Sequence, residues 1–499
     1  MRFFVFTVLL GVSAMASATD YYVSPSGNDS NPGTSPEQAW KSLTPANAVS
    51  LAPGDRLLFE EEQTFSGTLK LDRQDSGTAE KRVVIASYGE GRATIDGGAG
   101  TAVLAEECDS IDIQNLIVKG AGRKNGNSGC GVHLLYSRGA SISGVEAHGF
   151  RNSGVLVEGV RDARIEKVHA HDNGFAGIAV GNEQRWSEDV RIAHCIAENN
   201  PGDPENRDNH SGNGIVVGCV RNCTIEYCEA FNNGWDMPRE GNGPVGIWAW
   251  NADRVVVQFC VSHDNKSPSW DGGGFDLDGG VTNSILQYNL SYNNVGPGYF
   301  MCMYWGAPVW KNNIIRYNIS QNDGSREGQN AGIRVHWMEG MSDAEIYNNT
   351  VYNEIGAAVD FKGDQAPRMR FRNNIFVSKK TLITGGANKA RFEGNLYWLL
   401  DGKPFEVDGH TSLEAWSNAT GQEMLDGKLV GLWADPKLVR PGITTHTDPV
   451  TLAKLKEYLL ESGSPCIGAG LIIEDNGARD FWGHPVPSAD KPSLGAHQP

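Results

Sequence analysis

A five-residue phrase that begins with glycine recurs between residues 214 and 360 and constrains the fold more than any other feature. In each copy the second and fourth residues are apolar, whereas the third and fifth vary in size and charge. The copies are Gly214-Ile-Val-Val-Gly218, Gly246-Ile-Trp-Ala-Trp250, Gly274-Phe-Asp-Leu-Asp278, Gly298-Tyr-Phe-Met-Cys302, Gly332-Ile-Arg-Val-His336 and Gly356-Ala-Ala-Val-Asp360. Alternation with a period of two is typical of a strand that buries one face. We therefore expect the third and fifth positions to face water and to present a site.

A second repeat supplies the period of the fold. Equivalent positions in a phrase of the type Ile-x-x-Asn-(apolar)-x-x-Asn lie 21 to 33 residues apart. They are occupied by Asn115, Val145, Val168, Cys195, Cys228, Cys260, Asn289, Asn318, Asn349, Asn374 and Asn395. Spacings of this size indicate a solenoid whose coils stack about 4.8 Å apart, with asparagines that bond to one another along the stack. We therefore predict an all-β chain that forms a parallel β-helix.

The ends of the chain differ from this repeat. Residues 1–18 combine a basic start, an apolar run and Ala16-Ser17-Ala18, which predicts a signal peptide cleaved after Ala18 and a secreted or periplasmic protein. The N-terminal strand and cap region, 19–89, is predicted to start with a strand and a loop within 19–43, followed by a capping helix at 44–51 and by strands near 55–60 and 83–87. The β-helix proper is predicted at 90–400, and 401–499 as a closing segment on the last coils that includes a helix at 452–462.

Composition excludes some classes of partner. The formal net charge of -17 argues against nucleic acid, and no later stretch is long enough to span a membrane. Among nine cysteines, Cys195, Cys228 and Cys260 fit a buried ladder, and Cys219 with Cys223 is a candidate disulfide. We expect a monomer.

The chain resembles secreted right-handed parallel β-helix proteins of the pectate-lyase-like superfamily, which act on polysaccharides. The resemblance rests on the opening Tyr-Tyr-Val-Ser-Pro-Ser-Gly-Asn-Asp, the asparagine ladder, the block Gly-Gly-Phe-Asp-Leu-Asp-Gly-Gly at 273–280 and the closing Leu-Gly-Ala-His. It implies a right-handed helix, a polysaccharide or oligosaccharide substrate, and either a glycoside hydrolase or a polysaccharide lyase. The polygalacturonase signature is absent, so the resemblance leaves the reaction open.

Asp276 and Asp278 are the strongest catalytic candidates. Their Cα atoms, at positions i and i+2 of one strand, would lie about 6.6–7 Å apart. Glycosidases need two carboxyl groups, and this spacing fits either a retaining or an inverting arrangement. His336 is predicted to relay protons, and Asp360 is an alternative catalytic carboxylate.

The neighbouring copies of the phrase supply candidates for substrate binding. Trp248 and Trp250 could stack on sugar rings, and Arg334 could hold a sugar carboxylate. Further candidates on the same face or in the loops beside it are Lys362, Tyr304, Trp305, Glu240 and Asp271.

Three functions therefore compete. We favour a hydrolase that needs no cofactor and uses the aspartate pair. The runner-up is a lyase, in which Lys362 takes a proton and Ca²⁺ is held by Asp271, Asp276 and Asp278. The third is a β-helix that binds glycans without cleaving them.

Overall fold

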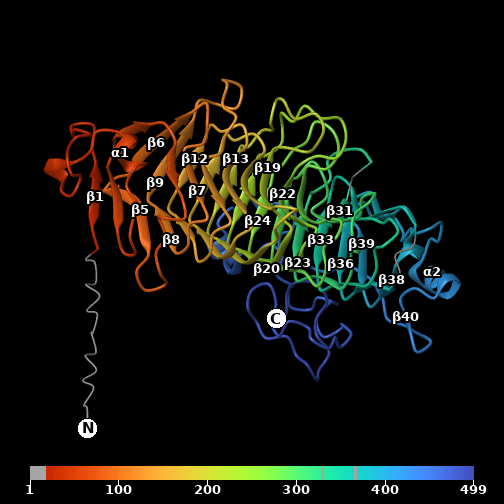
Figure 1. Ribbon diagram of the computed structural model, residues 1–499. Helices are drawn as coiled ribbons and strands as arrows, with labels where there is room; N and C mark the ends of the chain where they lie inside the picture. The colour runs from red at the N-terminus through yellow and green to blue at the C-terminus, as the bar shows by residue number, and fades with distance from the viewer. Residues whose placement is uncertain (1–17, 329–330, 365–367) are drawn as a thin grey trace, which may run out of the picture.

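The computed structural model describes residues 18–328, 331–364 and 368–499. Residues 1–17, which hold nearly all of the predicted signal peptide, lie outside the described residues. The described chain is almost entirely β-structure, and its coils follow one another along a single elongated body (Figure 1). No helix among the described residues is both long and apolar enough to cross a bilayer.

Three parallel sheets form the walls of a β-helix, as predicted. In the described residues they contain 14, 12 and 14 strands, and each strand pairs with its equivalent one coil away. The 12-stranded sheet is made of β4 (Leu69–Leu71), β7 (Val103–Glu106), β10 (Val132–Leu135), β13 (Ser153–Glu158), β16 (Ala176–Val180), β19 (Asn213–Gly218), β22 (Val245–Trp250), β25 (Gly273–Leu277), β28 (Tyr299–Cys302), β31 (Ala331–His336), β34 (Ala357–Lys362) and β37 (Thr381–Thr384). It contains all six copies of the glycine phrase.

The apolar positions of that phrase form the core. Ile247, Phe275, Tyr299, Ile333 and Val359 are at most 1% exposed. The rings of Phe275 and Tyr299, one coil apart, are stacked with centroids 5.3 Å apart. Glycine opens the first four phrases because it lies against the carbonyl oxygen of the next coil: a Cβ on Gly214 would stand 2.4 Å from the Gly246 oxygen. The repeat is thus a packing requirement as well as a pattern. The last copy is offset by two residues from the predicted alignment, because the register pairs Asp360, its fifth residue, with Arg334, a third residue.

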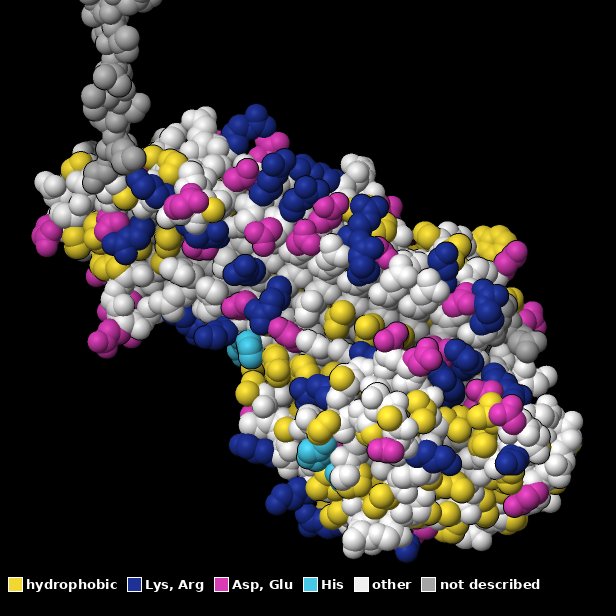
Figure 2. All heavy atoms as spheres, turned by 90° about the horizontal axis from the view of Figure 1, so that it is seen from below, with side chains coloured by type: hydrophobic (Ala, Val, Ile, Leu, Met, Phe, Trp, Pro, Cys, Tyr) yellow, Lys and Arg dark blue, Asp and Glu magenta, His cyan; other side chains and the backbone are white. Residues whose placement is uncertain are grey.

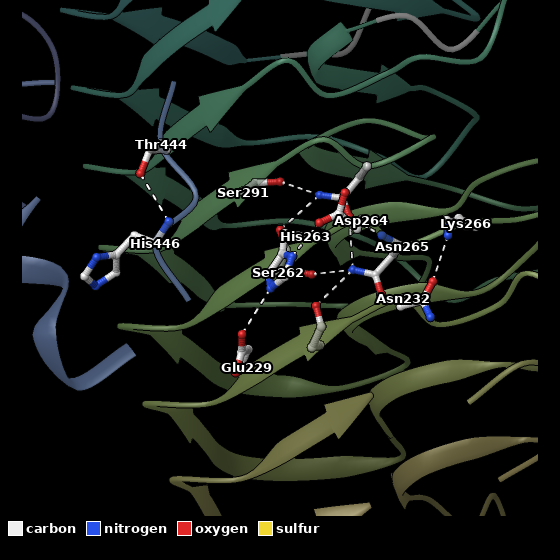
Figure 3. A network of polar contacts seen from close by, with 12 residues as sticks. Glu229, Asn232, Ser262, His263, Asp264, Asn265, Lys266, Ser291, Thr444 and His446 are labelled. Carbon is white, nitrogen blue, oxygen red and sulfur yellow. Dashed lines mark hydrogen bonds and ion pairs between the residues drawn. The ribbon is translucent and has the colours of Figure 1, made fainter. Parts of the chain in front are cut away.

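Asparagine ladders join the coils at two corners. The predicted ladder runs from Asn289 to Asn395, each side-chain oxygen accepting from the backbone N–H and the amide of the preceding member. A second ladder, which the sequence analysis missed, is formed by Asn173, Asn200, Asn233, Asn265, Asn294 and Asp323. Figure 3 shows Asn265 of this ladder beside Ser262, to which its amide donates.

The start of the predicted ladder was wrong by one residue. Asn115 is exposed, and the strand register gives its place to Leu116, which is fully buried. The cysteine part was right: Cys195, Cys228 and Cys260 are buried. Cys219 and Cys223 are free thiols, as are the other seven cysteines. They do not pair, because Cys223 points into the core while the Cys219 sulfur accepts from the Asn251 amide.

The N-terminal region has the predicted strands and a shorter helix. The strands are β1 (Asp20–Val23), β2 (Arg56–Glu60) and β5 (Val83–Tyr88), whereas α1 covers only Leu43–Ala46. Ser42 caps α1 by accepting from the Thr44 N–H. The helix ends early because the Asn47 side chain bonds to the backbone of Thr68 and Lys70 on the first coils.

The C-terminal segment departs most from prediction. A helix, α2 (Leu413–Thr420), was missed, and the helix expected at 452–462 is absent apart from a 3-10 stretch, Pro449–Lys454. That stretch cannot continue, because the backbone of Glu457 and Leu459 accepts hydrogen bonds from Arg440 and Val439.

The segment also reaches further than the last coils. It folds back beneath the middle of the body (Figure 1), where Tyr458 donates to Gln321 and the Arg479 guanidinium lies 4.9 Å from the Phe259 ring. In the view from below, acidic and basic side chains are interspersed over the surface (Figure 2), so this face presents no broad region of one charge.

Candidate active site

Strand register sets the outward residues of the 12-stranded sheet in two adjoining columns. One column contains Trp248, Asp276, Phe300, Arg334 and Asp360. The other contains Cys302, His336 and Lys362, and it continues through the residues that follow β25 and end β22, Asp278 and Trp250. The side chains predicted to share one wall therefore do so.

The two columns differ in exposure, which corrects one expectation. The third positions of the phrase were predicted to face water, yet Trp248, Asp276, Phe300 and Arg334 are only 3–4% exposed. They are covered because the long loops before the strands fold over them, whereas the fifth positions remain partly open.

A cavity of about 770 Å³ lies over these columns. The loops before three strands of this sheet, at 200–213, 235–245 and 265–273, all contribute residues to it. The side chains around it are Glu183, Asp208, Asn209, His210, Arg239, Asn242, Trp248, Trp250, Trp270, Asp271, Asp276, Asp278, Phe300, Cys302, Met303, Tyr304, Trp305, Arg334, His336, Met338 and Lys362. A volume of this size suits a ligand of several rings.

Among the described residues, five carboxyl groups line the cavity, and three of them, Asp271, Asp276 and Asp278, have raised pKa values. Burial raises the pKa of Asp271 to about 7, and the charge of Asp278 adds to the rise, although the Gly243 N–H donates to Asp271 at 2.8 Å. Burial raises the pKa of Asp278 to about 6, against a 2.7 Å hydrogen bond from the Gly279 N–H. Both carboxyls are partly exposed, so each can reach a ligand and titrate near neutrality.

Asp276 is the buried member of the three. Its Oδ1 atom has no hydrogen-bond partner among the described residues. Burial, together with the carboxyls of Asp278 and Asp271, raises the pKa of Asp276 well above its usual value. Trp248 and Phe300 lie on either side of it in the column, and these apolar surroundings favour the protonated, uncharged form of the group.

Basic groups lie beside the acids without neutralising them. The buried Arg334 donates to the Gly328 carbonyl at 2.6 Å, and its Nε atom lies 3.5 Å from Asp360. Burial, with the nearby Lys362 and Arg334, lowers the pKa of His336 to about 4. Its ring is therefore neutral near pH 7, with Nδ1 3.9 Å from the Cys302 sulfur.

The imidazole of His210, which is also neutral near pH 7, packs against Trp248. His210 accepts from the Asn213 amide at 3.1 Å and meets Trp248 edge to face, with centroids 4.8 Å apart. The Trp248 indole N–H donates to the Asn213 oxygen at 3.0 Å. Burial, then the charge of Arg239, lowers the pKa of His210 to about 4. These contacts fix Trp248 as part of the cavity floor.

Most of the predicted site residues line this cavity. Asp276, Asp278, His336, Trp248, Trp250, Arg334, Lys362, Tyr304 and Asp271 are among its side chains. Glu240 is exposed outside it, and Asp360 lies behind Arg334, where it accepts from Thr384. Phe300 and Cys302 were missed although the repeat positions them by register. Trp270 and Arg239 were missed because no pattern marks a loop residue.

The aspartates do not form a compact group of metal ligands. Among the described residues, the one cluster of three ligating side chains with atoms within 4.8 Å of one another is Asp480, His484 and His497, in the C-terminal segment. A calcium site at Asp271, Asp276 and Asp278 thus remains a prediction from the sequence alone.

Comparisons with known proteins identify a family and relatives of this chain. The family model described as "Pel9A-like, right handed beta helix region" matches residues 21–330. The lacto-N-biosidase of Bifidobacterium longum subsp. longum is 24% identical over 611 residues, which cover 96% of this chain and 36% of that protein. The chain thus spans about a third of the length of this relative.

Two solved structures are similar in fold. The GH136 lacto-N-biosidase from Eubacterium ramulus has a TM-score of 0.54 at 18% identity over 77% of this chain and 68% of its own. The complex of XylC with xylose has a TM-score of 0.52 at 11% identity over 96% of this chain and 98% of its own. At such identities the likeness concerns the fold alone.

Proposed function

This chain belongs to the Pel9A-like right-handed β-helix family, and on that premise we propose that it is a glycoside hydrolase acting on a glycan outside the cytoplasm. The single observation that carries the proposal is the pair of partly exposed carboxyls, Asp271 and Asp278, in a cavity where burial raises their pKa values to about 7 and 6. Hydrolysis of a glycosidic bond needs one protonated and one ionised carboxyl.

The higher pKa of Asp271 supports one assignment of the roles. Asp271, the more proton-retaining group, is the general acid that protonates the leaving oxygen. Asp278 is the nucleophile, or the base that activates water. This differs from the pair expected from the sequence, because Asp276 is buried and has a pKa well above its usual value. We assign it a hydrogen bond to the substrate rather than the role of acid or nucleophile.

The surrounding residues position the sugar. Trp248 and Trp250 offer aromatic surface, and the neutral His336 can bond to a hydroxyl group without adding charge. Arg334, already paired with Asp360, balances part of the negative charge of the cavity. The relative from Bifidobacterium longum makes a lacto-N-bioside the first substrate to try.

A lyase is the second candidate, and the neutral ring of His336 favours it, because an uncharged imidazole can take a proton. Against it, an ionised Asp278 in the same cavity would repel the uronic acid that a lyase cleaves, and the Arg334 guanidinium is already paired with Asp360.

The test is a screen of plant, algal and animal glycans together with p-nitrophenyl lacto-N-bioside. Each digestion is followed by new reducing ends and by the ultraviolet absorbance of unsaturated sugars. A hydrolase gives reducing ends without absorbance, whereas a lyase gives both. Binding without cleavage of any glycan would leave only the non-catalytic alternative.

A further inference from the structure

Aromatic side chains stand at both rims of the cavity, outside the columns described above. Trp270 is 46% exposed, Tyr304 39% and Trp305 90%. Trp270 ends the loop that leads into β25, and the other two follow β28. Because the strands are parallel, the segments before and after them form opposite walls. The cavity therefore has one aromatic wall on each side of its carboxyls.

The wall that carries Trp270 is rigid and positively charged. The backbone N–H of Trp270 donates to the Gly241 carbonyl at 3.0 Å, and the backbone N–H of Gly241 donates to the Ser269 hydroxyl at 2.9 Å. These two hydrogen bonds join the two loops. The Lys362 Nζ atom lies 5.1 Å from the centre of the Trp270 ring. A half-exposed indole with an ammonium over one face can stack its other face on a sugar ring, and the ammonium can bond to the sugar hydroxyls.

The opposite wall is seated on the residue after Asp278. A Cβ on Gly279 would lie 2.6 Å from the Tyr304 ring, so this ring packs against the Gly279 backbone. Trp305 extends further into solvent. The two walls thus adjoin different acids: Trp270 precedes Asp271, and Tyr304 covers the turn after Asp278.

We propose that Trp270 and Lys362 form a binding site for the sugar on the leaving-group side of the scissile bond. This rests on the proposed function, in which Asp271 donates its proton to the leaving oxygen and so must adjoin the leaving sugar. The wall of Tyr304 and Trp305 then receives the sugar on the other side of the bond. The substrate is consequently a glycan with rings on both sides of the cleaved linkage, rather than a glycoside of a small alcohol.

The test compares two leaving groups on one glycon: lacto-N-biosyl fluoride and the tetrasaccharide in which lacto-N-biose is linked to lactose. Fluoride needs neither a stacked ring nor a proton. Trp270→Ala should lower kcat/KM about tenfold on the tetrasaccharide, the size of a stacking contact, and leave it unchanged on the fluoride. Trp305→Ala is the matched control from the other wall and should lower both equally. Equal losses for Trp270→Ala on the two substrates would overturn the assignment.

Asp271→Asn, assayed on the same pair, separates this inference from the proposed function. It should lose activity on the tetrasaccharide and retain it on the fluoride; loss on both would refute the acid role of Asp271 while the result for Trp270 is read independently.

If neither probe is cleaved, Asp278→Asn protein with and without Trp270→Ala is applied to a glycan array. Binding that falls at least tenfold with Trp270→Ala supports the sugar site. Equal binding by the two proteins, or no binding by either, overturns it.

Discussion

Two buried clusters of ionisable groups lie in the same coil, and they differ in one respect. β24 (Val261–His263) and β25 are consecutive strands, so His263 and Asp276 are separated by a single corner. His263 bonds through both ring nitrogens, to Asp264 at 2.7 Å and Glu229 at 3.1 Å (Figure 3), and it stacks between Phe231 and Tyr292. Asp276 is equally buried and leaves Oδ1 without a partner.

The difference separates structure from function. A buried polar group without a partner costs about 1–3 kcal/mol, and native chains keep few of them. In the His263 cluster the ionisable groups bond to one another and so hold neighbouring strands together. The aspartate cluster keeps unsatisfied oxygen and raised pKa values inside a cavity, which is the arrangement expected where a ligand completes the hydrogen bonds.

The largest effect is expected at Asp278. Asp278→Asn should lower kcat by about 10⁴-fold, because the amide can neither attack the sugar nor activate water. Asp271→Asn should cost about 10²–10⁴-fold on sugar leaving groups. Both are measured by initial rates, with thermal unfolding as the control for folding. Full activity of the Asp278→Asn protein would contradict the functional difference between the aspartate cluster and the His263 cluster.

His263→Ala should do the reverse. It leaves Glu229 and Asp264 without their shared partner, and we expect unfolding to become easier by about 2–3 kcal/mol with kcat unchanged. Chemical denaturation and initial rates on the same preparation measure the two quantities. A large loss of kcat in a stable His263→Ala protein would give this cluster a catalytic role.

Substitutions at Asp276 test whether this residue is a neutral hydrogen-bond donor or a catalytic carboxylate. Asp276→Leu should raise KM by roughly 10-fold, since a substrate hydrogen bond is lost, whereas Asp276→Asn, which can still donate, should stay within about 3-fold of wild type. If Asn and Leu abolish kcat alike, Asp276 is itself a reacting group, as the sequence first suggested.

The two clusters should also respond to pH in opposite ways. Activity should rise as Asp278 ionises through about pH 6 and fall as Asp271 loses its proton through about pH 7, which gives a bell-shaped profile. Burial alone would lower the pKa of His263, but its bonds to Asp264 and Glu229 outweigh burial and raise it.

His263 therefore contributes stability that is complete below its unfolded pKa, 6.5, and is lost as pH rises through the higher folded value. Its loss on the alkaline side is read from unfolding curves recorded at a series of pH values. An activity profile without an alkaline limb would contradict the acid role of Asp271.

Chelation should have the smallest effect. If the aspartates act as an acid and a nucleophile or base, dialysis against EDTA leaves kcat/KM unchanged. A loss restored by Ca²⁺ would instead support the metal alternative at Asp271, Asp276 and Asp278.

The parts of the fold and of the candidate site that could be predicted are those set by the sequence repeat. The glycine phrase fixed the register, so Asp276, Asp278, Arg334 and His336 were correctly set on one wall. Burial of the third positions was not predictable, because it depends on loops without a repeat. For the same reason Trp270 escaped notice and Glu240 was included. The prediction of a helix at 452–462 was wrong, because the apolar residues of this segment pack in another way: Leu455 and Tyr458 lie beneath the middle coils.

The most direct test of the central claim is digestion of the best-cleaved glycan in water enriched in oxygen-18, with the products weighed by mass spectrometry. The account predicts that wild-type protein adds one heavy oxygen at the cleaved sugar, forms no unsaturated product, and loses this activity in Asp278→Asn. An unsaturated product without heavy oxygen, or cleavage that persists in Asp278→Asn, would contradict it.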